Sequence, residues 1–98
     1  MTPNAANMLP VLWRTKARLS LAQINDYIAD RNPIAAQRIK DAIEQAVSNL
    51  PQHPYLYRSG LFAGTREIVV HPNYVVVYRV TNSAIEIINV LHSRQQYP

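Results

Sequence analysis

The sequence predicts an α+β fold: an antiparallel four-stranded sheet with an N-terminal helical hairpin packed on one face, in the order β-α-α-β-β-β. Two observations support this prediction. Residues 15–50 contain two stretches with the apolar spacing of helices, separated by a short break. Residues 65–91 contain three runs rich in β-branched residues, separated by short turn sequences.

The first apolar residues predict a strand followed by a helix. Val11–Trp13 has the composition of a short strand, and Pro10 restricts it to the beginning or the edge of a sheet. Thr15 is the expected N-cap of a first helix that runs to about Asp30. The apolar residues of this stretch share one helical face: Ala17, Leu21, Ile24 and Ile28.

A second helix is predicted directly after a break that contains proline. Asn32 is the expected N-cap and Pro33 the first helical residue, where a missing N–H costs nothing. Pro51 ends the pattern. Such a short break implies an antiparallel hairpin laid on a flat surface. The second apolar stripe consists of Ala36, Ile39, Ile43, Ala46 or Val47, and Leu50.

The remaining residues predict a loop and three strands. Residues 51–64 are rich in proline and aromatic residues, and we expect the tyrosines and Phe62 to fill the gap between helices and sheet. Strands are predicted at about 65–70, 74–80 and 84–91, joined as an antiparallel meander. Their apolar residues point to both faces, so the helices should cover one face and part of the other should also be used.

Length and composition exclude several classes of protein. A chain of 98 residues fits one small domain, and we expect residues 1–8 to be a flexible leader before a domain at 9–98. There is no cysteine, and the three histidines lack metal-ligand spacing, so we expect neither a metal nor a cofactor. No apolar run reaches the roughly 20 residues needed to span a bilayer, and the N-terminus lacks signal-peptide features. We therefore expect a cytoplasmic protein with no membrane partner.

The net charge of the chain does not identify its partner. The net charge is +4, and arginine provides most of the cations. Its planar guanidinium suits carboxylate or phosphate groups, so the chain could meet nucleic acid or an acidic protein. A charge of this size can equally serve solubility alone.

Three stretches resemble the RelE/ParE superfamily of type II toxins. They are DYIADRNPIAAQRIKDAIEQAV (26–47), GTREIVVHPNYVVVYRV (64–80) and VLHSRQQYP (90–98). The resemblance covers nearly all of residues 9–98 in the same order. It implies a toxin that a cognate antitoxin wraps and neutralises, and that contacts promoter DNA only through the antitoxin complex.

The superfamily holds two chemistries. RelE-type members cut mRNA on the ribosome without a metal, and ParE-type members bind and poison DNA gyrase. A metal-free nuclease needs cations against the phosphorane charge and groups for proton transfer. On this alternative the resemblance assigns catalysis to Arg66, His92, Arg94 and Tyr97.

Two positions disfavour the nuclease. Ile68 and Val75 stand where the RelE-type pattern places cations, and an apolar side chain can neither donate a proton nor balance a charge. Long predicted helices also fit the ParE type, so gyrase inhibition by protein–protein binding is the favoured function. The alternatives are the nuclease and a non-toxic member that regulates the promoter it shares with its antitoxin.

Arg66 is the strand residue most in need of explanation. It alternates with Ile68 and Val70 on a largely apolar face, where a guanidinium must find a partner or reach the edge. Two explanations are open. Arg66 could form an ion pair with Glu86 or with an acidic residue of a helix, or it could have a functional role. A toxin poised for capture by an antitoxin should also expose some apolar surface.

Overall fold

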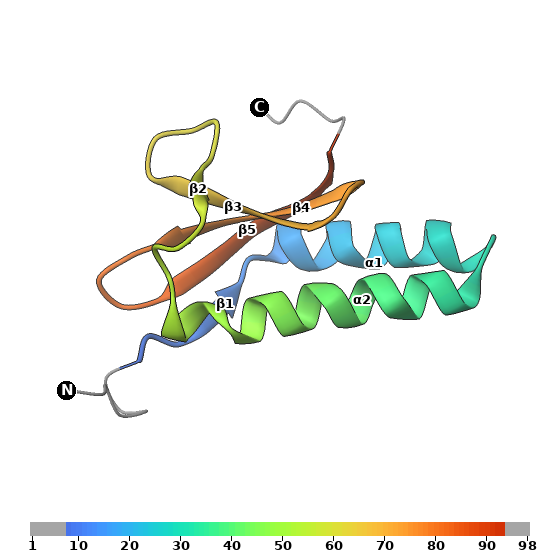
Figure 1. Cartoon of the computed structure of the whole chain (residues 1–98), viewed down its shortest axis with the longest axis horizontal. Helices are drawn as coiled ribbons and strands as arrows, with labels where there is room; N and C mark the ends of the chain where they lie inside the picture. The colour runs from blue at the N-terminus through green and yellow to red at the C-terminus, as the bar shows by residue number, and fades with distance from the viewer. Residues whose placement is uncertain (1–7, 94–98) are drawn as a thin grey trace.

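In the computed structural model, which describes residues 8–93, two helices lie side by side across one face of a five-stranded sheet (Figure 1). The sheet order is β1-β5-β4-β3-β2. Residues 1–7 of the predicted leader lie outside the described residues. The elements are β1 (Val11–Trp13), α1 (Thr15–Ala29), α2 (Pro33–Ser48), the 3₁₀ turn η2 (Leu50–Gln52), β2 (Arg58–Ser59), β3 (Thr65–His71), β4 (Tyr74–Val80) and β5 (Ile85–His92).

The α+β class and the helical hairpin are confirmed, but the prediction of a four-stranded antiparallel sheet is wrong in two details. β1 pairs in parallel with β5, because the chain leaves β1 through both helices before it enters the meander. A further strand, β2, pairs with β3 inside the segment predicted as a loop. Two residues are too few to show a period in the sequence.

The two helices begin differently. Asn32 caps α2 as predicted: its Oδ1 accepts a 3.0 Å hydrogen bond from the Ala35 amide, and Pro33 is the first helical residue. The predicted capping by Thr15 is wrong, because Thr15 is itself helical and the cap position is Arg14, whose side chain makes no capping bond. The α2 helix ends at Ser48, before the 3₁₀ turn that contains Pro51.

The core lies between the helices and the sheet. Ile43 and Leu50 from the helical half meet Val76, Tyr78 and Ile87 from the sheet, all of them fully buried. This burial of apolar surface is the main stabilising contribution to the fold.

The face of the sheet turned away from the helices, here called the second face, holds a smaller apolar cluster. Val75, Val77 and Leu91 are buried there, with Ile88 packed against them. Because β4 is central, every residue from Tyr74 to Tyr78 is buried. The prediction that both faces of the sheet are used is confirmed. Within residues 8–93, neither helix has the length and apolar character needed to cross a membrane.

Candidate functional site

Arg66, the first candidate catalytic residue, holds a loop in place. It pairs with Tyr78 across β3 and β4, on the face that the helices cover. Its Nη1 donates hydrogen bonds to the carbonyl oxygens of Tyr55 (3.1 Å) and Tyr57 (2.8 Å). The guanidinium carbon also lies 5.1 Å from the centre of the Tyr55 ring. The cation is therefore directed at the backbone before β2.

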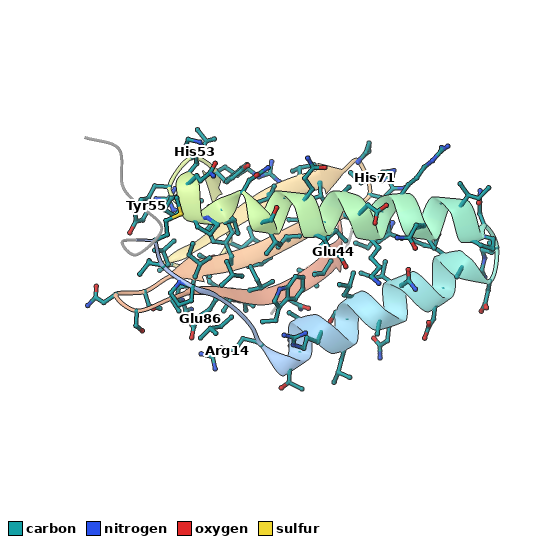
Figure 2. All side chains as sticks on the ribbon, turned by 90° about the horizontal axis from the view of Figure 1, so that it is seen from below. Arg14, Glu44, His53, Tyr55, His71 and Glu86 are labelled. Atoms are coloured by element: carbon teal, nitrogen blue, oxygen red, sulfur yellow. The ribbon has the colours of Figure 1, made fainter. Side chains whose placement is uncertain are left out.

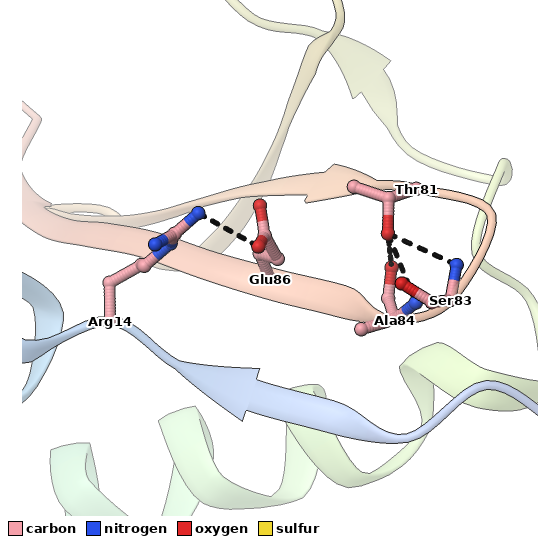
Figure 3. Close-up of polar contacts among 5 residues, drawn as sticks. All are labelled: Arg14, Thr81, Ser83, Ala84 and Glu86. Atoms are coloured by element: carbon pink, nitrogen blue, oxygen red, sulfur yellow. Dashed lines mark hydrogen bonds and ion pairs between the residues drawn. The ribbon is translucent and has the colours of Figure 1, made fainter.

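The ion pair between Arg66 and Glu86, one of the alternatives left open by the sequence, does not form. Glu86 belongs to β5 and binds Arg14 instead, with 2.8 Å between Arg14 Nη2 and Glu86 Oε2 (Figure 3). Arg14 directly follows β1, so this contact lies beside the parallel pairing of β1 with β5. With the Arg14 side chain 57% exposed, the ion pair contributes little to stability.

His92, the second candidate, ends β5 next to two other rings. It pairs with Tyr74 in the sheet, and the two rings meet edge to face with centroids 5.4 Å apart. The His71 ring lies 5.8 Å from Tyr74 on its other side. Burial, and then the nearby Tyr27, raise the pKa of Tyr74 above the ordinary tyrosine value. His92 thus closes a row of aromatic rings.

The structure does not bring Arg66 and His92 together. Arg66 pairs with Tyr78 on one side of β4, and His92 pairs with Tyr74 on the other side. The two pairs are four positions apart along β4, which corresponds to roughly 13 Å along the strand. One nucleotide phosphate could not contact both side chains. The other two candidates, Arg94 and Tyr97, lie outside the described residues.

The two positions at which the nuclease pattern expects cations are buried and apolar. Ile68 is 4% exposed in the main core and Val75 is 7% exposed on the second face. The second face also carries an ion pair and a hollow. Arg58 binds Glu67 there, with 2.8 Å between Nε and Oε1. A hollow of about 360 Å³ is lined by both apolar and charged residues, among them Val69, Val75 and Arg58.

Within residues 8–93 no group of three or more histidine, aspartate or glutamate side chains could hold a metal.

The loop before β2 contains residues whose exposure the sequence analysis missed. Tyr57 packs edge to face on Tyr78, with centroids 6.4 Å apart, as expected for a residue that fills the gap. The same prediction is wrong for Tyr55 and Phe62, which are 65% and 47% exposed. Leu56, between the two tyrosines, is 70% exposed. The feature of the sequence that could have indicated this exposure is an apolar residue in a proline-rich turn, where burial is hard to achieve.

The fold and the residue pattern define the RelE/ParE class of small type II toxins. A family model described as the ParE toxin of the type II toxin–antitoxin system parDE matches residues 11–97. The chain therefore belongs to the ParE toxin family within the RelE/ParE superfamily.

Two relatives agree with this assignment, and one solved structure shares the fold. Toxin RelE2 of Caulobacter vibrioides is 35% identical over 86 residues, which cover 88% of this chain and 97% of that protein. The putative toxin Y4kP of Sinorhizobium fredii is 35% identical over 89 residues, covering 90% and 92%. The chromosomal ParDE system of P. aeruginosa contains a chain with the same fold, with a TM-score of 0.76, 21% identity and coverage of 87% and 96%.

Proposed function

We propose that this toxin inhibits DNA gyrase by direct protein–protein binding and that a cognate antitoxin neutralises it. The observation that carries the proposal is the use of Arg66: both of its hydrogen bonds go to loop carbonyl oxygens. A cation committed to the backbone is poorly placed to stabilise a phosphorane that forms elsewhere. Membership of the ParE family supports the same target.

The buried apolar positions support the same conclusion. A nuclease of this class would need cations at Ile68 and Val75, but both sites are closed to solvent. A charge introduced there would lose its hydration without a partner, which is costly. A gyrase inhibitor needs no such charges, since its contribution is a complementary surface. Action on gyrase implies that the toxin works in the cytoplasm.

The antitoxin partner is supported by the apolar surface of the helical half. Leu19 and Ile34, one on each helix, are 59% and 67% exposed. A hollow of about 420 Å³ between α1 and α2 is lined by Trp13 and Leu21 and by charged residues of both helices, so it could receive an antitoxin segment that carries apolar and charged side chains. Contact with promoter DNA would then occur through the antitoxin complex.

The test compares both targets in one experiment. The toxin is induced briefly without antitoxin, and gyrase-dependent supercoiling is scored beside primer extension on cellular mRNA. We expect trapped gyrase–DNA cleavage complexes with intact messages. The double variant Arg94→Ala/Tyr97→Ala should remain toxic, because gyrase binding needs no catalyst at those positions. Cuts confined to translated messages, lost in that variant, would establish the nuclease and place Arg94 and Tyr97 in its catalytic site. Normal growth with neither effect would favour the non-toxic regulator.

A further inference from the structure

Tyr55 and Leu56 form a protruding apolar pair, here called the knuckle. The side chains are 65% and 70% exposed, and they are adjacent in the connection between η2 and β2. In Figure 2, Tyr55 lies beside His53 at the end where α2 finishes, far from the α1–α2 connection. Single exposed apolar residues are common on proteins, so exposure alone does not indicate a binding role.

The knuckle is distinguished by the bonds that fix its backbone. The Tyr78 hydroxyl donates a 2.7 Å hydrogen bond to the Pro54 carbonyl oxygen. Arg66 donates to the carbonyl oxygens of Tyr55 and Tyr57, one before and one after Leu56. Both donors belong to the long central strands of the sheet. The backbone of the exposed pair is therefore fixed before any partner binds, which lowers the entropy cost of binding.

The shape of the knuckle indicates the kind of partner. Two side chains that project from a fixed loop need a preformed pocket, which a folded protein can offer. A flexible antitoxin segment that brings its own apolar side chains needs a hollow instead, and the space between α1 and α2 provides one. The knuckle and the interhelical hollow therefore suit different partners.

The charge of the surface around the knuckle further limits the class of partner that could bind it. No aspartate or glutamate occurs from Gln45 to Arg66. Of the two arginines that flank the knuckle, Arg58 is paired with Glu67, and Arg66 binds only neutral carbonyl oxygens, so its positive charge is not offset there. A pocket with an acidic rim would complement this surface. A second copy of this chain would not, because each copy carries a net charge of +4.

We propose that the knuckle is the anchor by which this toxin enters an apolar, acid-rimmed pocket of DNA gyrase. This inference rests on the proposed function and adds the contact residues to it. Tyrosine is enriched among the residues that dominate the binding energy of interfaces, so Tyr55 is the main anchor, and the neighbouring Leu56 adds apolar contact area. Loss of such an anchor typically weakens binding by about 30-fold or more.

The experiment measures the Kd of purified toxin for immobilised, purified DNA gyrase. The test variant is Tyr55→Ser/Leu56→Ser, and the matched control is Leu12→Ser, which removes another exposed apolar side chain, from β1. We expect the double variant to bind about 30-fold more weakly and the control to stay within about twofold of wild type. Thermal unfolding of all three proteins checks that the fold is retained.

The outcomes separate this inference from the proposed function. If wild type and the double variant bind gyrase equally, the knuckle is not the anchor, and gyrase inhibition itself stands. Equal losses in the double variant and in Leu12→Ser would also overturn the inference. If wild-type toxin does not bind gyrase at all, both the proposed function and the anchor fail.

Discussion

The hydroxyl group of Tyr78, on the central strand β4, donates a 2.7 Å hydrogen bond to the carbonyl oxygen of Pro54 in the loop before β2. Tyr78 is fully buried, and its position couples the centre of the sheet to the segment that carries Tyr55 and Leu56. The two residues are 24 positions apart in the sequence. The bond is therefore a tertiary contact that closes a loop around the core.

Removal of this hydroxyl should destabilise the fold. In Tyr78→Phe the ring and its packing remain, but the Pro54 carbonyl oxygen loses its donor. We expect the free energy of unfolding to fall by about 1–2 kcal/mol. Urea denaturation followed by circular dichroism measures the change. Tyr27→Phe, at a site 59% exposed, is the matched control and should leave the midpoint in place. An unchanged midpoint in Tyr78→Phe would show that the bond contributes nothing.

Because the Tyr78 phenol is buried, the stability of the fold should fall at alkaline pH. Burial raises the pKa of Tyr78 to about 12, the nearby Arg66 partly opposes the rise, and Tyr57 adds to it. In the unfolded chain the phenol ionises near its ordinary pKa of 10.0. Since the folded state keeps the proton longer, this contribution is fully present below pH 10 and is lost as pH rises toward 12.

The loss can be measured against the variant that lacks the phenol. Over that pH window the Tyr78 contribution should decline by about 2–3 kcal/mol. Urea denaturation at pH 8, 10 and 11 should therefore show a steeper fall for wild type than for Tyr78→Phe, with about half of the decline reached at pH 11, because other groups titrate alike in both. Parallel pH profiles for the two proteins would contradict the assignment to Tyr78.

The Thr81 hydroxyl group makes several hydrogen bonds within the turn between β4 and β5 (Figure 3). The Thr81 Oγ1 accepts hydrogen bonds from the amides of Ser83 (3.3 Å) and Ala84 (3.0 Å) and donates to the Ala84 carbonyl oxygen (3.0 Å). Thr81→Val keeps the side-chain shape and removes these bonds. We expect it to lower the free energy of unfolding by about 1–2 kcal/mol, measured by urea denaturation. Ser83→Ala retains the Thr81 hydroxyl and should cost less than about 0.5 kcal/mol. Equal effects of the two substitutions would contradict this role.

The contrast between α2 and β2 shows how far sequence reasoning reaches. The start of α2 follows from Asn32 and Pro33 alone, because capping and the fixed proline backbone act within one turn of helix. The meander follows from three apolar runs that alternate with short turns. β2 could not be predicted, since Arg58–Ser59 becomes a strand only through its pairing with β3.

The candidate site shows the same limit. The sequence indicates that Arg66 needs a partner, because its neighbours Ile68 and Val70 are apolar. The actual partners are main-chain carbonyl oxygens of Tyr55 and Tyr57, and every residue carries such an acceptor. A side-chain pattern cannot identify which carbonyls a guanidinium will reach. For the same reason the sequence could not separate a catalytic arginine from one that holds a loop.

Substitution of Arg66 tests whether it fixes the loop. Arg66→Met keeps a long side chain but removes both hydrogen bonds, so the backbone around Leu56 should become mobile. The Leu56 amide, which donates a 3.2 Å bond to the His53 carbonyl oxygen, should exchange its hydrogen at least about tenfold faster. Hydrogen exchange followed by NMR measures this directly. Arg66→Lys retains one charged donor and should restore part of the protection.

The matched control is Arg38→Met, an exposed arginine on α2, which should leave the exchange of the Leu56 amide unchanged. Because Arg66→Met retains both side chains of the knuckle, its affinity for gyrase should fall less than that of Tyr55→Ser/Leu56→Ser. This loss of affinity should reflect the conformational entropy that a mobile loop loses on binding. Wild-type protection of the Leu56 amide in Arg66→Met would show that the two carbonyl bonds do not hold the loop. The cation would then have to be reconsidered as a group that acts on RNA.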